Sequence, residues 1–320
     1  MMRIFRTENS VVHELKDIKE LHRPGREGCW IEMTNPSSAE ASRIELELGV
    51  DHDDVMAAID PEEKNRVDLQ EDYTLILVDI PSREVRHSKQ RYTTIPLGLI
   101  LTENHIVTVC SEETPILQYF HHNAVRGFST KKKLRFVYQI MLRVSLAYQR
   151  ALTVIDKART EFEENIEKIT EEADLISLHE LESTLVYFAT SLRGNANVLN
   201  KLARYGQLQQ YPEDRELLDD VIIENQQAIE MTQIYRDIID GTRQLISTLM
   251  DNRLNEVMKR LTSITLILAV PTMISGMYGM NVDTRWMPFA NTFQGFWIIG
   301  AIIIAICIIL LWILKRMKML

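Results

Sequence analysis

Cysteine is nearly absent from this sequence, and glycine and proline are scarce: its 320 residues include 3 cysteines, 12 glycines and 9 prolines. The three cysteines lie far apart, at Cys29, Cys110 and Cys307. An odd number without close pairs excludes a disulfide framework and a zinc knuckle, and it fits a reducing cytosol. The first residues contain no apolar segment, so we expect no cleaved signal peptide.

Features of enzymes and of nucleic-acid binders are also missing. We find no nucleophile motif, no histidine cluster for a metal and no GxxxxGK[ST] phosphate loop. The net charge is −9, and no basic stripe with interleaved aromatic residues is present. We therefore expect a protein that is not an enzyme, needs no cofactor and does not bind nucleic acid.

Charge is absent from two apolar segments near the C-terminus, residues 261–278 and 296–314. Each can cross a hydrocarbon core of about 30 Å as a helix. The first segment also contains hydroxyl side chains, namely Thr262, Ser263, Thr265, Thr272 and Ser275. Such groups are costly against lipid, so we expect them to face a protein or a water-filled interior.

Basic residues flank the two spans on one side only. They are Lys259 and Arg260 before the first span and Lys315, Arg316 and Lys318 after the second. The loop between the spans has only Asp283 and Arg285 as charged residues. The positive-inside rule predicts a multi-pass protein of the inner (plasma) membrane with both termini in the cytoplasm. Aromatic belts are expected from Trp286, Phe293, Phe296 and Trp297 outside and from Trp312 inside.

Residues 1–128 mix strand and helix patterns and predict an α/β domain with a mixed or antiparallel sheet. The expected strands are MRIFR, CWIEM, YTLILVDI, TTIPLGLIL and HIVTVC. Pro81 and the polar stretch SREVRHSKQR are expected to separate two of these strands. SSAEASRIELELGV, with a capping pattern, and TPILQYFHH are expected helices.

Three long helices follow, at about 130–171, 176–205 and 213–278, with breaks near 172–176, Gly194, 205–213 and Gly241. The last would measure about 100 Å and runs into the first span. We therefore expect three domains: α/β at 1–128, a cytosolic helical stalk at 129–257, and a transmembrane part at 258–320. The spans are placed at about 258–279 and 295–314, with a basic tail after them.

A seam of small and polar residues follows the last helix at a spacing of four and three residues. It contains Gly276, Thr272, Ala269, Thr265, Thr262 or Leu261, Met258, Asn255 and Asp251. Residues at this spacing lie on one side of the helix, and that side faces the axis of a helix bundle. They either pack closely between membrane helices or line a pore.

The segments NEVMKRLTSI (Asn255 to Ile264) and YGMN (Tyr278 to Asn281) resemble the CorA family of divalent-cation channels. The family signature is Gly-Met-Asn at the end of the first of two C-terminal membrane helices. The order of an α/β domain, long helices, two spans and a basic tail also matches. The resemblance implies an α+β membrane protein that forms a funnel-shaped homopentamer in the lipid bilayer.

The family also implies roles for individual residues. Asn281 would form the selectivity filter at the outer mouth, with Gly279 and Met280 shaping the turn. Asn255, Met258, Leu261 and Thr272 would line the pore, with Met258 and Leu261 as a hydrophobic gate; Thr265 and Gly276 join them from the seam. The acidic ring expected after Met287-Pro288 is replaced by Phe289, and Asp283 is the candidate substitute at the outer mouth.

The expected cargo is a divalent cation. Mg²⁺ gives up its water reluctantly, and a ring of neutral amide oxygens can hydrogen-bond the hydrated ion and still release it. Uptake then runs down the electrochemical gradient. Zn²⁺, Co²⁺ and Ni²⁺ remain alternatives, because the family includes zinc transporters with the same signature.

Intracellular Mg²⁺ closes the pore in the family. Counting back along the stalk from Asn281 places Asp220, beside Asp219, at the position of a family sensor acid. Its partner is sought among Asp53, Asp54 and Asp60, although each is also a candidate for an ordinary surface carboxylate. The acidic segment 161–174 fits a solvated face, and His121-His122 fits a metal pair poorly.

A second hypothesis is a membrane-anchored coiled-coil scaffold without transport. It requires only that the hairpin tether the stalk. The polar residues in the first span argue against it, because a tether needs none.

Overall fold

The protein was analysed as a computed structural model. It describes residues 1–9, 11–15, 18, 21, 27–86, 89–121, 125–164, 172–204, 212–281, 283, 285, 287–289 and 292–317. Packing divides the chain into two compact units, Met1–Gly241 and Thr242–Leu320. The predicted domain boundaries near 128 and 257 are a finer division and stay predictions.

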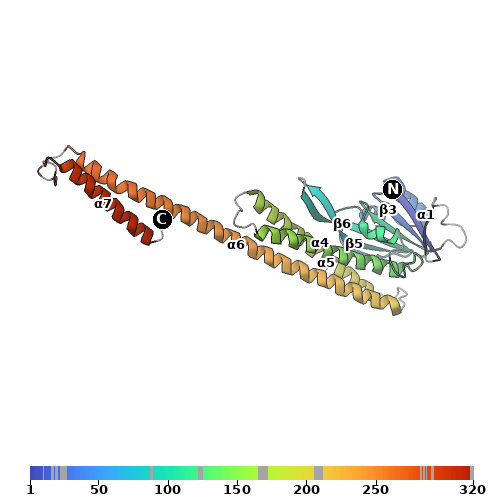
Figure 1. Ribbon diagram of the computed structural model, residues 1–320. Helices are drawn as coiled ribbons and strands as arrows, with labels where there is room; N and C mark the ends of the chain where they lie inside the picture. The colour runs from blue at the N-terminus through green and yellow to red at the C-terminus, as the bar shows by residue number, and fades with distance from the viewer. Residues whose placement is uncertain are drawn as a thin grey trace. The chain divides into compact units, whose positions relative to one another are not determined.

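The first unit contains seven strands in one mixed sheet of order β2-β1-β3-β7-β6-β5-β4 (Figure 1). The strands are β1 Met2–Glu8, β2 Val11–Leu15, β3 Cys29–Thr34, β4 Arg66–Leu69, β5 Tyr73–Arg86, β6 Lys89–Thr102 and β7 His105–Cys110. Only β3 and β7 are parallel neighbours, and the other pairs are antiparallel. The predicted mixed sheet is confirmed, and its two short strands β2 and β4 were not predicted.

Seven helices complete the described residues. They are α1 Ser38–Leu48, α2 His52–Ala57, α3 Pro115–His121, α4 Lys133–Glu164, α5 Glu172–Arg204, α6 Pro212–Tyr278 and α7 Gly295–Arg316. The predicted capping of α1 is present, because Ser37 and Glu40 form a capping box. α6 is one helix of 67 residues, as predicted.

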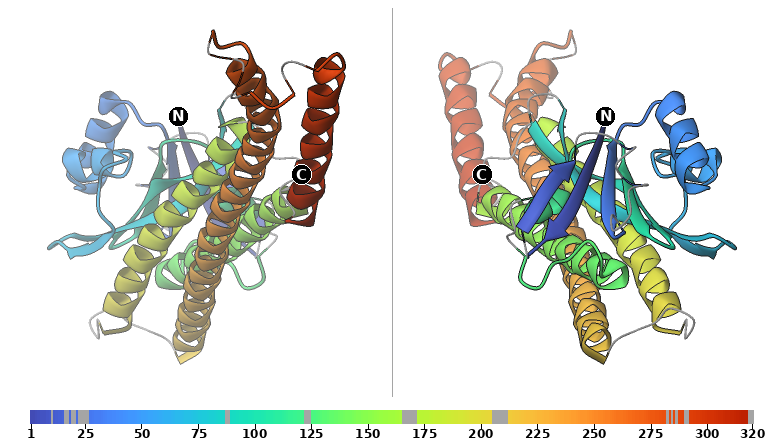
Figure 2. Two further views of the ribbon diagram at one scale, coloured as in Figure 1. Left: turned by 90° about the vertical axis from the view of Figure 1, so that its left-hand side faces the viewer. Right: turned by 90° about the vertical axis from the view of Figure 1, so that its right-hand side faces the viewer.

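Helices cover both faces of the sheet. Figure 2 shows α1 and α2 on one face and α4 and α5 on the other. Successive side chains of β3 point to opposite faces of the sheet, so the strand contributes to the core on both faces. Ile31 and Met33 belong to the core beneath α1 and α2. Trp30 points to the opposite face, where its ring packs against Phe120 and Phe136. Both faces are therefore buried, which explains the nearly continuous apolar strands.

The expected break between β5 and β6 is wrong. The two strands pair from Tyr73↔Thr102 to Arg86↔Lys89, so Pro81 lies inside β5 opposite Thr94. β4 pairs with β5 only as far as Leu77, and β7 pairs with β6 only from Leu97 onward. Beyond those residues no further strand of the described chain pairs with β5 or β6. An edge outside the ladder needs no N–H from proline and tolerates polar residues.

The long helices differ from the prediction at one boundary, and α5 and α6 run through the breaks expected at Gly194 and Gly241. α5 begins at Glu172, so the expected break at 172–176 is wrong. α4 ends at Glu164 in the structure, and residues 165–171, which were expected to be helical, lie outside the described residues. The polar stretch there is rich in good helix formers, so composition alone could not show where the chain turns.

A buried polar contact joins β5 to α5. The amide of Asn195 donates to the Asp79 carbonyl over 2.8 Å, and the Asp79 N–H donates to Asn195 Oδ1 over 3.0 Å. Burial raises the pKa of the Asp79 carboxyl, although Ser191 and Asn65 hydrogen-bond it. The ionised carboxylate is therefore less favourable in the folded chain than in the unfolded one.

The raised pKa of Asp79 predicts how the stability of the folded chain changes with pH. Because the folded pKa of Asp79 is raised, its contribution is fully present below the unfolded pKa and is lost as pH rises through the folded pKa. We expect Asp79→Asn to gain stability relative to wild type as pH rises above about 4. Thermal unfolding at pH 4 and pH 7 measures this; an equal difference at both pH values would contradict it.

Gly98 on β6 gives a second prediction. A Cβ at this position would lie 2.4 Å from the Ala58 Cβ at the end of α2. We expect Gly98→Ala to cost about 1–3 kcal/mol of unfolding free energy, because the packed layers must separate. Denaturant unfolding of the full chain measures it.

Gly241→Ala is the matched control, because a Cβ there meets nothing within 4 Å in the chain. In a helix this change should be neutral or stabilise by up to about 1 kcal/mol. Equal losses in both variants would show that the contact with Ala58 does not restrict β6.

Candidate functional site

The Gly-Met-Asn signature forms the end of α6. The Gly279 N–H donates to the carbonyls of Ser275 over 3.0 Å and Gly276 over 3.2 Å. The Met280 N–H reaches the Met277 carbonyl over 3.3 Å. Asn281 is the first residue beyond this closing turn, and its side chain is exposed. Its amide is therefore free of packing against the rest of the described chain.

Tyr278 connects this turn to the loop that follows. Its hydroxyl donates to the Pro288 carbonyl over 2.8 Å. The next residue, Phe289, has φ 64°, and its carbonyl accepts the Thr292 hydroxyl over 2.8 Å. Gly295, the first residue of α7, lies against the same carbonyl. A Cβ at position 295 would lie only 2.1 Å from the Phe289 carbonyl oxygen. The loop end therefore requires glycine at position 295.

These three contacts were not predicted from the sequence. From the sequence, Tyr278 was expected only to precede the Gly-Met-Asn signature, and Phe289 was only a departure from the family pattern. A proline-aromatic pair followed by glycine at a helix start signals a tight connection. The sequence could not show that the tyrosine hydroxyl meets the Pro288 carbonyl.

Asp283, the proposed outer-mouth acid, is exposed and has a local partner. Its Oδ1 accepts the Arg285 N–H over 3.1 Å, and the guanidinium Nε lies 3.8 Å away. This pair reduces the negative field that Asp283 alone would offer a cation. Exposed pairs of this kind contribute about 0–1 kcal/mol, so an arriving divalent ion can compete with it.

The predicted pore-lining residues lie on α6 and are exposed. They are Asn255, Met258, Leu261, Thr265, Thr272 and Gly276. Met258 is 52% exposed and Leu261 57%, so neither packs within its own chain. The seam is thus available to other copies, to lipid or to water.

The threonine hydroxyls of the first span form hydrogen bonds within their own helix. The hydroxyls of Thr262, Thr265 and Thr272 donate to the carbonyls four residues earlier, over 2.8, 2.9 and 2.7 Å. This bonding lowers the cost of placing threonine in lipid. Their presence alone therefore does not demand a water-filled interior, which weakens one argument made from the sequence.

The four proposed regulatory acids do not converge. Asp53 accepts from His52, 3.1 Å away, and Asp54 accepts the Tyr73 hydroxyl over 2.6 Å. Asp219 and Asp220 are exposed on α6. Within the part of the chain that the structure describes, no three His, Cys, Asp or Glu side chains could hold a metal ion together.

His121 has a structural role. Its Nε2 lies 2.8 Å from Glu32 Oε2, and both side chains are 8% exposed. The ring stacks on Phe5 and Trp30 at 4.6 and 5.2 Å. This packing makes His121 part of the core beside β1 and β3; His122 lies outside the described residues.

The apolar segments give two helices that are long and apolar enough to cross a membrane, within α6 and α7. The profile of the CorA-like Mg²⁺ transporter family matches residues 25–316. The chain belongs to this family. Its members are membrane transporters or channels for divalent metal ions, and no catalytic family is indicated.

Individual relatives agree with this assignment. The chain is 30% identical over 295 residues to the cobalt/magnesium transport protein CorA of Methanocaldococcus jannaschii, covering 90% of each sequence. It is 26% identical over 231 residues to the CorA of Thermotoga maritima, covering 69% of this chain and 64% of the relative. The complete structure of the M. jannaschii CorA magnesium transporter superposes with a TM-score of 0.85 at 27% identity, over 99% and 98% of the two chains.

The Tyr278 contact is testable in the full-length protein. Tyr278→Phe removes one hydrogen bond to the Pro288 carbonyl, which is worth about 1 kcal/mol. We expect about fivefold faster hydrogen–deuterium exchange at residues 279–281, measured by mass spectrometry. Tyr187→Phe, at a position 58% exposed on α5, is the control and should leave that exchange unchanged. Unchanged exchange in both variants would show that the contact does not hold the turn.

Proposed function

We propose that the protein is a channel that takes up Mg²⁺ down its electrochemical gradient and recognises the ion in its hydrated form. The observation that carries this proposal is the placement of Asn281. It stands exposed directly after the last turn of α6, at the end of a membrane helix that Tyr278 ties to the next loop. A transporter of this family needs a polar group at such a mouth.

The chemistry of Asn281 suits a hydrated cation. Its amide oxygen accepts hydrogen bonds from water without carrying a full charge. Mg²⁺ keeps its water shell in most protein sites, so contact through that shell avoids the dehydration cost. Binding then stays weak enough for release, which conduction requires. Gly279 and Met280 complete this filter by forming the turn that presents the amide.

A pore follows from several copies of α6 placed around an axis. The exposed residues Asn255, Met258, Leu261, Thr265, Thr272 and Gly276 would line it. Met258 and Leu261 lie at its cytoplasmic end and supply a hydrophobic constriction, which gates by expelling water. We propose a homopentamer with a funnel shape and with both termini in the cytoplasm.

Mg²⁺ is the first choice among cations, and the M. jannaschii and T. maritima relatives are named as cobalt/magnesium transport proteins. Co²⁺, Ni²⁺ and Zn²⁺ are the alternative cargoes. An outer-sphere filter selects mainly by charge and hydrated size, so it distinguishes these ions poorly.

Closure by an intracellular divalent ion would need acids from two copies. Asp53 and Asp54 lie on α2, and Asp219 and Asp220 lie on α6, without a shared cluster in one chain. Two acids from each of two copies would supply the oxygen ligands that Mg²⁺ prefers; Asp53, Asp219 and Asp220 are exposed, and Asp54 is partly buried. Cation binding there would hold copies together, and its loss would free them.

Uptake into proteoliposomes loaded with a divalent indicator tests the filter. We expect Asn281→Ala to reduce Mg²⁺ uptake at least tenfold, because the ring of water acceptors is removed. Asn200→Ala, on the exposed surface of α5, is the control and should conduct like wild type. Wild-type uptake by Asn281→Ala would rule out the Asn281 filter.

The same assay separates the alternatives. Uptake of Zn²⁺ without Mg²⁺ would change the cargo and keep the pore. No uptake of any of the four ions by intact oligomers, after removal of internal divalent ions, would favour the membrane-anchored scaffold.

The regulatory acids give a distinct prediction. Asp219→Asn combined with Asp220→Asn removes two charges from each copy, so we expect at least tenfold more internal Mg²⁺ to be needed for closure. Uptake measured against internal Mg²⁺ concentration shows this shift. An unchanged closure curve would exclude these acids while leaving the Asn281 filter intact.

A further inference from the structure

Four basic residues lie at one level of the second unit, beyond the inner ends of both spans. Lys259 and Arg260 on α6, like Lys315 and Arg316 on α7, stand about 20 residues from the loop that joins the helices. At 1.5 Å per residue this is about 30 Å along each helix. The hydrocarbon core has about the same thickness, so these cations reach the headgroup layer of the inner leaflet.

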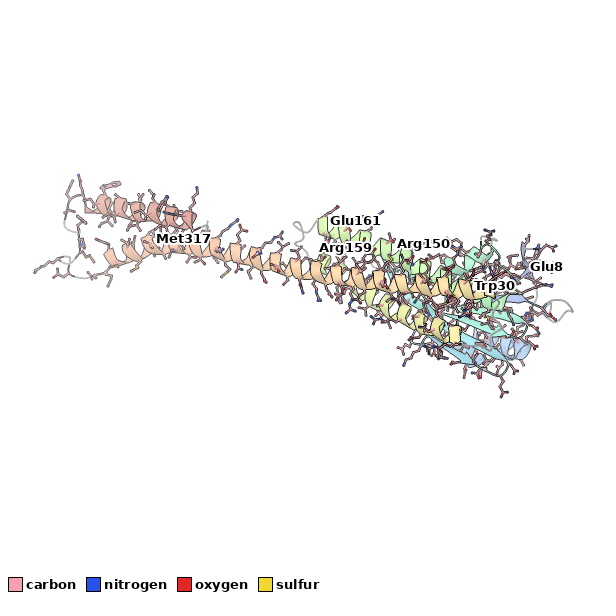
Figure 3. All side chains as sticks on the ribbon, turned by 90° about the horizontal axis from the view of Figure 1, so that it is seen from below. Glu8, Trp30, Arg150, Arg159, Glu161 and Met317 are labelled. Atoms are coloured by element: carbon pink, nitrogen blue, oxygen red, sulfur yellow. The ribbon has the colours of Figure 1, made fainter. Side chains whose placement is uncertain are left out.

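One side of α7 is buried at its inner end, and the opposite side is open. Leu314 is 4% exposed. Trp312 and Arg316 stand two residues before and two residues after Leu314, so they lie on the opposite side of the helix. Figure 3 labels Met317, the residue that follows α7 at this end.

The local charge is strongly unbalanced. Glu256 pairs with Arg260 over 2.6 Å. Lys259, Lys315 and Arg316 are exposed, and the Arg316 guanidinium lies over the Trp312 ring at 5.4 Å. Trp312 is itself 61% exposed, and Ile308 and Ile309, one turn toward the membrane centre, are 60% and 57% exposed. Cations thus sit directly above an open apolar surface.

We propose that this end of the hairpin is a binding site for an anionic phospholipid of the inner leaflet. Lys315 and Arg316 contact the phosphodiester, and Trp312 packs beside the glycerol backbone. The acyl chains lie along Ile308 and Ile309. The combination of two cations with an apolar surface below them fits a lipid phosphate rather than a free anion, which gains nothing from that surface.

Each lysine or arginine near an anionic headgroup strengthens binding by about fivefold. We therefore expect the full-length protein in detergent to bind phosphatidylglycerol at least tenfold more tightly than phosphatidylcholine. Native mass spectrometry of lipid-bound oligomers measures both affinities. The double variant K315Q/R316Q should lose most of this preference.

The double variant K201Q/R204Q is a matched control, because it removes the same two charges from the last turn of α5 in the first unit. It should keep the preference. Equal binding of the two lipids by wild type, or an unchanged preference in K315Q/R316Q, would overturn the proposal. Competition by soluble glycerol phosphate as effective as that of the lipid would show a free-anion site instead. None of these measurements depends on conduction.

Discussion

Apolar surface that the chain cannot cover by itself constrains the whole of the second unit. Leu268 on α6 is 63% exposed and Ile304 on α7 is 62% exposed, and Phe296 reaches 81%. Two helices packed side by side can hide only one narrow face of each. Lipid supplies cover of this kind in the membrane, and under the proposed function further copies of the chain supply the rest.

The same incompleteness explains where the functional groups lie. The α/β domain closes its own core on both faces of the sheet, and His121 is absorbed into it through Glu32, Phe5 and Trp30. The polar groups proposed for transport show the opposite behaviour. Asn281 and the α6 seam are exposed, and the proposed sensor acids do not meet within the described chain. Under the proposed function each becomes a site only when copies assemble.

The connection between α6 and α7 combines rigidity with an exposed amide. Tyr278, the Phe289 carbonyl and Gly295 fix the two ends of the loop, and none of them has to touch an ion for this purpose. Under the proposed function, a fixed turn would place Asn281 without ordering it anew for each ion, which favours rapid and reversible recognition. On the cytoplasmic side, the proposed lipid site would hold the other end of the same hairpin.

Local patterns in the sequence determined the strands β1, β3, β5, β6 and β7, the α1 cap and the course of α6, because periodicity and capping depend on near neighbours. They also indicated the Asn281 turn through its motif. Tertiary structure decided that the β5–β6 pairing continues past Pro81, because the edges of the ladder depend on how far β4 and β7 extend. It also decided that His121 pairs with Glu32 and that Tyr278 meets Pro288. Contacts between residues far apart, or across a turn of unknown path, leave no periodic trace in the sequence.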